Sequence, residues 1–228
     1  MTIRPIGQSG YVLKSGTTEI IIDPYLSDIV NEKVGRPRLL PCPIDPKTVA
    51  ADAVICTHDH MDHLDPVSAA EMPKEQFFIT TREGKEHLRE LGQTHVTALA
   101  AGETLRVGNF EITAVFADHT VEAFGVILKA EGHTLYFSGD TLYHENLFDL
   151  AAYQPEVTFI CINGRLGNMN VKEALETAER IGAKVNIPTH YDMFASNSED
   201  PHRFADHIQG GKILEFNQSY DLKELIAE

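Results

Sequence analysis

The sequence predicts an α/β sandwich in which helices cover β-sheets. Short apolar runs separated by turns fill the first half of the chain, as is typical of strands joined in hairpins. Later in the chain, apolar runs alternate with a segment of helical spacing, which is typical of strand–helix units. The chain of 228 residues shows no internal repeat and no Pro/Ser-rich linker. We therefore predict a single domain over residues 1–228.

Apolar runs that have the length of a strand are predicted to form strands. These predicted strands are residues 11–14, 19–22, 53–56, 76–80, 96–99, 104–107, 110–117, 124–130, 134–138, 157–162, 184–187 and 212–216. Turn residues such as Ser15-Gly16 and Gly108-Asn109 join neighbouring strands into hairpins. Helices are predicted over residues 66–71, 82–91, 171–181 and 201–208. Asn170 and Glu173 have the spacing of a capping box at the start of the third of these.

Composition excludes several classes of protein. The formal net charge is −15, so the surface repels polyanions, and we expect binding neither to nucleic acid nor to an anionic membrane. No apolar run approaches the roughly 18 residues of a membrane span, and no signal peptide begins the chain, so the cytoplasm is the expected location. The three cysteines have no metal-binding spacing and are interpreted as reduced thiols.

The strongest local motif is Thr57-His58-Asp59-His60-Met61-Asp62-His63, which lies between a predicted strand and a predicted helix. Side chains alternate along a strand, so His58 and His60 project to the same side. A turn then brings Asp62 and His63 to face the same space. Three imidazoles and a carboxylate form a ligand set for one or two divalent metal ions.

Further metal ligands are predicted at the ends of other apolar runs. Four more runs deliver a His or Asp at their carboxyl ends, namely Asp23, His119, Asp140 and His190. Any one of these would commonly be a surface residue or a helix cap. Together with the His58–His63 motif they indicate one rim of a sheet sandwich where the loops gather.

In this order and spacing, the residues resemble the ordered motifs of the metallo-β-lactamase superfamily. The resemblance implies a four-layer αββα sandwich of two mixed β-sheets flanked by helices, with a two-metal centre at one edge. It implies that one Zn²⁺ or Mn²⁺ ion is bound by His58, His60 and His119, and a second by Asp62, His63 and His190. It also implies that Asp140 bridges the ions and that Asp23, which does not bind a metal ion itself, orients one of the ligands.

Chemically, the resemblance implies a hydrolase in which a metal-bridging hydroxide attacks a small, anionic ester, lactone or phosphodiester. Asp62 and Asp140 are the predicted catalytic residues, with Asp62 accepting the hydroxide proton. The stretches 162–170 and 188–194 look like the L-ascorbate 6-phosphate lactonase subgroup, in which homo-oligomers occur. Two other activities on the same scaffold are left open, thioester hydrolysis and mononuclear iron dioxygenation. A non-enzymatic metal-stabilised binding module is a further alternative.

Residues that contact the substrate are sought in the loops beside the predicted ligands. Asn163, Arg165 and Asn168 follow a predicted strand, and Arg165 could pair with a carboxylate or phosphate. Tyr191, beside His190, is a fourth candidate. The histidines outside the motifs are interpreted as surface or capping residues: His87, His95, His133, His144, His202 and His207.

Overall fold

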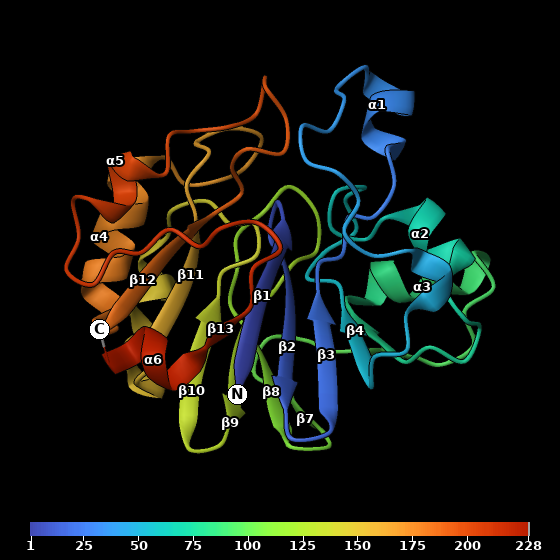
Figure 1. Cartoon of the computed structure of the whole chain (residues 1–228), viewed down its shortest axis with the longest axis horizontal. Helices are drawn as coiled ribbons and strands as arrows, with labels where there is room; N and C mark the ends of the chain where they lie inside the picture. Colours follow the sequence, from blue (N-terminus) through green and yellow to red (C-terminus); the bar gives the residue numbers. More distant parts are fainter. Residues whose placement is uncertain (228) are drawn as a thin grey trace.

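Two β-sheets lie face to face at the centre of the protein in the computed structural model, which describes residues 1–227 (Figure 1). The first sheet contains, in spatial order, β13 (Tyr220–Asp221), β1 (Thr2–Gly7), β2 (Gly10–Ser15), β3 (Thr18–Ile22), β4 (Ala53–Ile55), β5 (Phe78–Thr80) and β6 (Val96–Ala98). The second contains β12 (Val185–Thr189), β11 (Val157–Cys161), β10 (His133–Phe137), β9 (Gly125–Ala130), β8 (Phe110–Val115) and β7 (Thr104–Val107).

Both sheets are mixed. In the first, β3 to β6 are parallel while β1 to β3 are antiparallel, and in the second β10 to β12 are parallel while β7 to β10 are antiparallel. Strands β3, β4, β8, β10 and β12 consequently end at one shared edge, the upper edge in Figure 1. Loops from both sheets meet there, which positions the residues that follow these strands close together.

Helices form the two outer layers. Figure 1 shows α2 (Pro66–Glu71) and α3 (Arg82–Glu90) outside the first sheet, and α4 (Val171–Ile181) and α5 (His202–Ala205) outside the second. The predicted arrangement of two mixed sheets flanked by helices is therefore confirmed. The remaining helical segments are α1 (Ile29–Val34), α6 (Leu222–Ala227) and two 3₁₀ helices, Pro46–Thr48 and Glu145–Tyr153. None of the helices in residues 1–227 is both long and apolar enough to cross a membrane.

The apolar interior is divided by the sheets. Between them, Leu13 and Ile20 of the first sheet share a cluster with Leu128 and Phe159 of the second, all at 0–1% exposure. Removing one such side chain from water stabilises the fold by about 1.5–3 kcal/mol. Further clusters lie between each sheet and its helices. The sheets are thus held at a fixed separation, which fixes the loops at their shared edge.

Helix α4 forms as the sequence predicts. The Asn170 side chain accepts from the backbone N–H of Glu173, and the Glu173 side chain accepts from the backbone N–H of Asn170. Such a cap is worth about 0.5–2 kcal/mol. Gly182 ends the helix with a φ of 76°, in the left-handed conformation that glycine adopts readily.

Two predicted elements near the carboxyl end are wrong, one because no such strand forms and one because the helix is shorter than predicted. Residues 212–216 form no strand. The chain pairs with β12 only at the Asn186–Gly211 bridge and then crosses from the second sheet to the first. It reaches β1 where Asn217 N–H donates to Pro5 O. The predicted helix over residues 201–208 shortens to α5. Strand β1 was not predicted, because Pro5 weakens its strand signal.

Candidate metal centre

The loop between β4 and α2 carries the His58–His63 motif. Asp65 fixes its far end by capping α2, accepting hydrogen bonds from the backbone N–H groups of Val67 and Ser68. The same carboxylate accepts from the backbone N–H groups of Leu26 and Ser27, at 3.0 and 2.8 Å. The loop is therefore tied both to its own helix and to the segment that follows β3.

The motif meets residues from the second sheet and forms two groups of potential ligands. Donor atoms in each group all lie within 4.8 Å of one another. One group is His58, His60, His119 and Asp140, and the other is Asp62, His63 and His190. All seven residues predicted as ligands are therefore brought together, in the two sets that the family resemblance implied.

Asp140 lies between the two groups. Its Oδ2 atom is 3.9 Å from Nε2 of both His58 and His119, and 3.3 Å from Nε2 of His190. Its Oδ1 atom is 3.3 Å from His63 Nε2. One carboxylate thus faces both ligand sets, as a bridging ligand must.

The protonation of these residues fits a cation site. Burial, and then the nearby His63, hold the pKa of His58 well below its usual value, so its imidazole is neutral and has a lone pair to offer. Burial opposes charge on His63 and His190 as well, but the carboxylates, Asp140 first, outweigh it. They raise the pKa of His190 to about 9 and that of His63 well above its usual value. Without a metal ion, the carboxylates keep His63 and His190 protonated. A bound metal ion would supply the positive charge that these protons provide.

Two orphaned atoms give a further test of the fit. His63 Nε2 and Asp140 Oδ1 are buried and face each other at 3.3 Å, yet neither has an aligned hydrogen-bond partner within residues 1–227. Buried polar atoms are nearly always hydrogen-bonded, so an unpaired one needs an explanation such as a bound ion. The imidazole and carboxylate donors are those that zinc and manganese accept, so the residues present fit a divalent metal ion.

Residues just outside the two groups orient the imidazoles. Asp23, fully buried, accepts from Thr57 N–H and hydroxyl at 2.7 and 2.8 Å and contacts His63 Nδ1 at 2.9 Å. The Thr57 hydroxyl also contacts His58 Nδ1 at 3.0 Å. These contacts hold the rings so that both Nε2 atoms face the site. The structure thus places Asp23 where the sequence predicted it, whereas the part played by Thr57 was not foreseen.

Gly167 holds His119 from the other side. Its carbonyl oxygen lies 3.0 Å from His119 Nδ1. Its φ is +93°, and a Cβ atom there would lie 2.8 Å from the His119 ring. A side chain at this position would therefore both strain the backbone and displace the imidazole.

Gln8, which the sequence did not single out, closes one side of the centre. Its amide nitrogen donates to Asp62 Oδ2 at 2.7 Å and lies 3.0 Å from His190 Nε2. The residue has a φ of +55°, which is uncommon for a side chain larger than glycine. No motif marks it, because it lies in the turn after β1, a strand that was itself not predicted.

A cavity of about 490 Å³ opens onto this cluster, and His60, Asp62, Asp140 and His190 are among its lining residues. The rest of its wall combines apolar side chains with a few polar residues. The apolar ones are Val30, Val34, Met61, Leu166 and Phe194, and the others are Arg36, Asp59, Thr120, Gly167 and Asn197. Arg36 is half-buried and makes no ion pair or hydrogen bond within residues 1–227. A guanidinium without an ion pair has the chemistry to attract an anion, and no pattern in the sequence had singled out Arg36.

The residues predicted to contact substrate either lie away from the cluster or pack behind the cavity wall. Asn163 and Asn168 are buried and hydrogen-bond to each other at 2.9 Å, and Asn163 also donates to Asn197, which lines the cavity. Arg165 is exposed, donates to Ser196 O at 3.1 Å and does not line this cavity. Tyr191 lines a different cavity. The asparagines therefore support the wall, and the structure does not bring Arg165 or Tyr191 to the cluster.

The fold and the side-chain cluster together define an α/β sandwich with a candidate two-ion centre at the shared edge of its sheets. A match to the β-lactamase superfamily domain covers residues 18–191. A UPF0173 metal-dependent hydrolase of Methanospirillum hungatei is 30% identical over 100% of this chain and 96% of its own. Another, from Oenococcus oeni, is 28% identical over 97% of this chain and its whole length. The chain therefore belongs to the metallo-β-lactamase superfamily, within the UPF0173 family of metal-dependent hydrolases.

Solved structures show the same fold. A structure described as a possible metal-dependent hydrolase of Veillonella parvula superposes with a TM-score of 0.82 at 19% identity, covering 97% of this chain and 99% of that one. An isothiocyanate hydrolase from Delia radicum gut bacteria superposes with a TM-score of 0.80, also at 19% identity, with the same coverage. At this identity the likeness is one of fold alone.

Proposed function

We propose that this protein is a hydrolase that holds two divalent ions, Zn²⁺ or Mn²⁺, and cleaves a small anionic ester, lactone or phosphodiester. The observation that carries the proposal is the pair of ligand groups that share Asp140 at the floor of a cavity. Ions bound there would lower the pKa of a water molecule toward neutrality and polarise the bond to be cleaved. A purely structural site would normally be closed, so the open cavity also favours an enzyme over a binding module.

Asp62 is the proposed proton acceptor. It lines the cavity, and its side chain is 19% exposed, more than that of Asp140 at 6%. Burial raises the pKa of this carboxyl, but the imidazoles of His63 and His190 outweigh burial and hold the pKa well below its usual value. Asp62 is therefore an ionised carboxylate at neutral pH, and the Gln8 amide fixes the orientation of its Oδ2 atom.

Arg36 is the proposed anion-binding residue. Its guanidinium lacks a partner within residues 1–227 and lines the same cavity as the cluster. It can therefore form a charge-assisted contact with a carboxylate or phosphate without first breaking an ion pair. This assignment replaces Arg165, which was predicted from the sequence but does not line the cavity.

The apolar wall suggests that the anionic substrate also carries an apolar group. Val34 and Leu166 are 54% and 58% exposed, and both line this cavity. A bound apolar group would remove them from water at about 25 cal/mol for each Å² covered. The same wall could accept the acyl chain of a thioester, which makes thioester hydrolysis the second candidate. The complete second ligand group favours two ions over the single ion of an iron dioxygenase.

The test compares two arginine variants in metal-loaded protein. Arg36→Ala should lower kcat/KM for an anionic substrate by about 10- to 150-fold, the range for a lost charge-assisted hydrogen bond. Arg165→Ala is the matched control and should leave kcat/KM near the parent value. Generic lactones, thioesters and bis-p-nitrophenyl phosphate would serve as substrates, and metal analysis would count the ions. No turnover of any of them by protein with two bound ions would contradict the proposal.

A further inference from the structure

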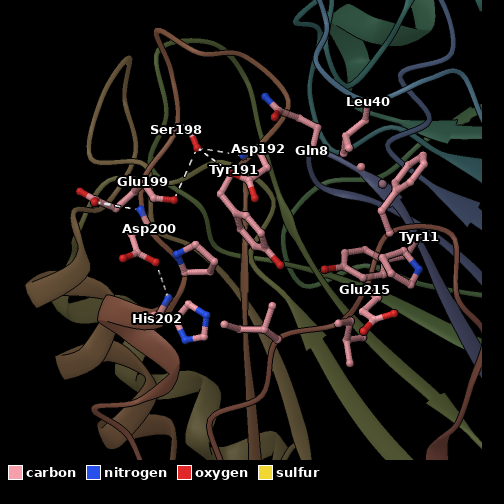
Figure 2. Close-up of a pocket in the computed structure, with 17 residues that line it drawn as sticks. Gln8, Tyr11, Leu40, Tyr191, Asp192, Ser198, Glu199, Asp200, His202 and Glu215 are labelled. Carbon is pink, nitrogen blue, oxygen red and sulfur yellow. Dashed lines mark hydrogen bonds between the residues drawn. The ribbon is translucent and has the colours of Figure 1, made fainter.

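A second cavity, of about 680 Å³, is lined in part by Gln8, whose side-chain amide also contacts Asp62 and His190 of the metal centre (Figure 2). It is formed by β1 and β2, by the segment 191–202 that follows His190, and by the crossing segment 213–216. Its volume falls within the range of about 300–1,000 Å³ that is common for small-molecule sites. Gln8 both lines this cavity and contacts the metal centre, but none of the seven candidate metal ligands lines the cavity.

Tyr11 reaches this cavity from the core. Its ring is 4% exposed and packs against Phe137 and Phe159, with ring centroids 5.5 and 4.7 Å apart. Its hydroxyl group has no hydrogen-bond partner within residues 1–227. Figure 2 shows the hydroxyl groups of Tyr11 and Tyr191 pointing toward each other across the cavity. Because this hydroxyl group opens onto the cavity and no protein group pairs with it, it is available to a ligand.

Both phenols remain neutral at physiological pH. Burial raises the pKa of Tyr11, and the neighbouring Tyr191 raises it further. Burial, followed by Asp192, raises the pKa of Tyr191. A neutral phenol oxygen accepts a hydrogen bond, so a ligand with N–H groups can pair with both residues.

The charged groups that line the cavity are nearly all acidic. They are Asp192, Glu199, Asp200 and Glu215, and neither lysine nor arginine is among the described residues that line it. Glu199 pairs with Arg203 at 3.0 Å, whereas Glu215 makes no ion pair within residues 1–227. The remaining basic group in the wall, His202, is held by Asp206 at 3.3 Å. The electrostatic potential in the cavity therefore favours a cation.

Apolar side chains form a further part of the wall. Leu40, Leu214 and Phe216 line the cavity together with the two tyrosine rings. Such a surface accommodates the apolar body of a ligand, while the acids and phenol oxygens take its charged end. Aromatic rings also attract cations electrostatically.

We propose that this cavity is a binding site for a small organic ammonium ion that carries an apolar group. The ammonium group lies between the tyrosine hydroxyls and the carboxylates of Asp192 and Glu215, and the apolar group packs on Leu40 and Phe216. The site is separate from the hydrolytic centre, so it does not depend on which bond that centre cleaves.

The experiment is calorimetric titration of the full-length, metal-loaded protein with phenethylamine, with 2-phenylethanol and 3-phenylpropionate as neutral and anionic controls. Phenethylamine should bind saturably at one site, and the controls should not. Tyr11→Phe keeps the packed ring and should weaken binding about tenfold, as expected for a lost hydrogen bond to a charged group.

The double variant Asp192→Asn/Glu215→Gln should weaken binding about fivefold for each carboxylate removed. Asn tolerates the left-handed conformation of Asp192, whose φ is +56°, so the backbone is preserved. Glu90→Gln/Glu179→Gln makes the same change of charge on helices α3 and α4, away from the cavity, and is the matched control. Equal binding of the three probes, absence of saturable phenethylamine binding, or an equal loss in the control variant would overturn the proposal.

Discussion

Metal-free protein should lose stability as the pH rises from about 6 to about 10, the window set by His190. The carboxylates around this buried imidazole raise its pKa from 6.5 to about 9. In the unfolded chain His190 releases its proton near pH 6.5, while the folded protein retains it. The contribution to stability is therefore complete below pH 6.5 and disappears as the pH rises through about 9.

The size of the loss follows from the same two values. A pKa of about 9 against 6.5 corresponds to about 3 kcal/mol of unfolding free energy at most. His63, whose pKa is also raised, acts in the same direction. Bound ions would replace both protons, so metal-loaded protein should show a much smaller change over this range.

Urea unfolding at a series of pH values, after removal of metal by a chelator, measures this loss. Other ionisable groups also contribute to the pH dependence of stability over this range. His190→Gln isolates the contribution of the imidazole, because this variant should lose a large part of the slope. A metal-free protein whose stability is level or increases from about pH 6 to about pH 10 would refute the reasoning.

Three further predictions concern the metal centre itself. Asp140→Ala should lower the occupancy of both ions and abolish hydrolysis, and a variant that keeps two ions and full turnover would rule out a shared ligand. Gly167→Ala should weaken metal binding through His119, measured by competition with a chelator, whereas Gly132→Ala is the control because its φ of +82° is similar but nothing lies within 4 Å. Finally, kcat should rise with pH to a plateau with an apparent pKa near neutrality, and a flat profile with chemistry rate-limiting would contradict it.

The metal ligands could be predicted because the pattern that carries them is local. Each follows an apolar run, and the carboxyl ends of neighbouring strands in a sandwich meet at one edge. Position along a strand therefore implied position in space for His58, His119, Asp140 and His190, and the structure brings them together. Asp23 was found by the same rule.

Substrate-contacting residues could not be predicted in this way, because loop residues have no periodicity that fixes their direction. His190 and Asp192 both have left-handed backbone angles, with φ of +63° and +56°. The chain turns sharply between them, so Tyr191 enters a different cavity from its neighbour His190. Arg36 lies just after the short helix α1, which is too short to show a helical pattern in the sequence. Its position beside the cluster depends on tertiary packing alone.

Each ligand group draws on both sheets. The residues after β4 belong to the first sheet, whereas His119, Asp140 and His190 follow strands of the second. An ion bound in either group would thus join segments that lie far apart in the chain, as a reversible crosslink. Neither half of the chain carries a complete ligand group, so full loading should follow the docking of the two sheets during folding. Separation of the sheets would require release of the ions, and chelation should therefore accelerate unfolding as well as end catalysis.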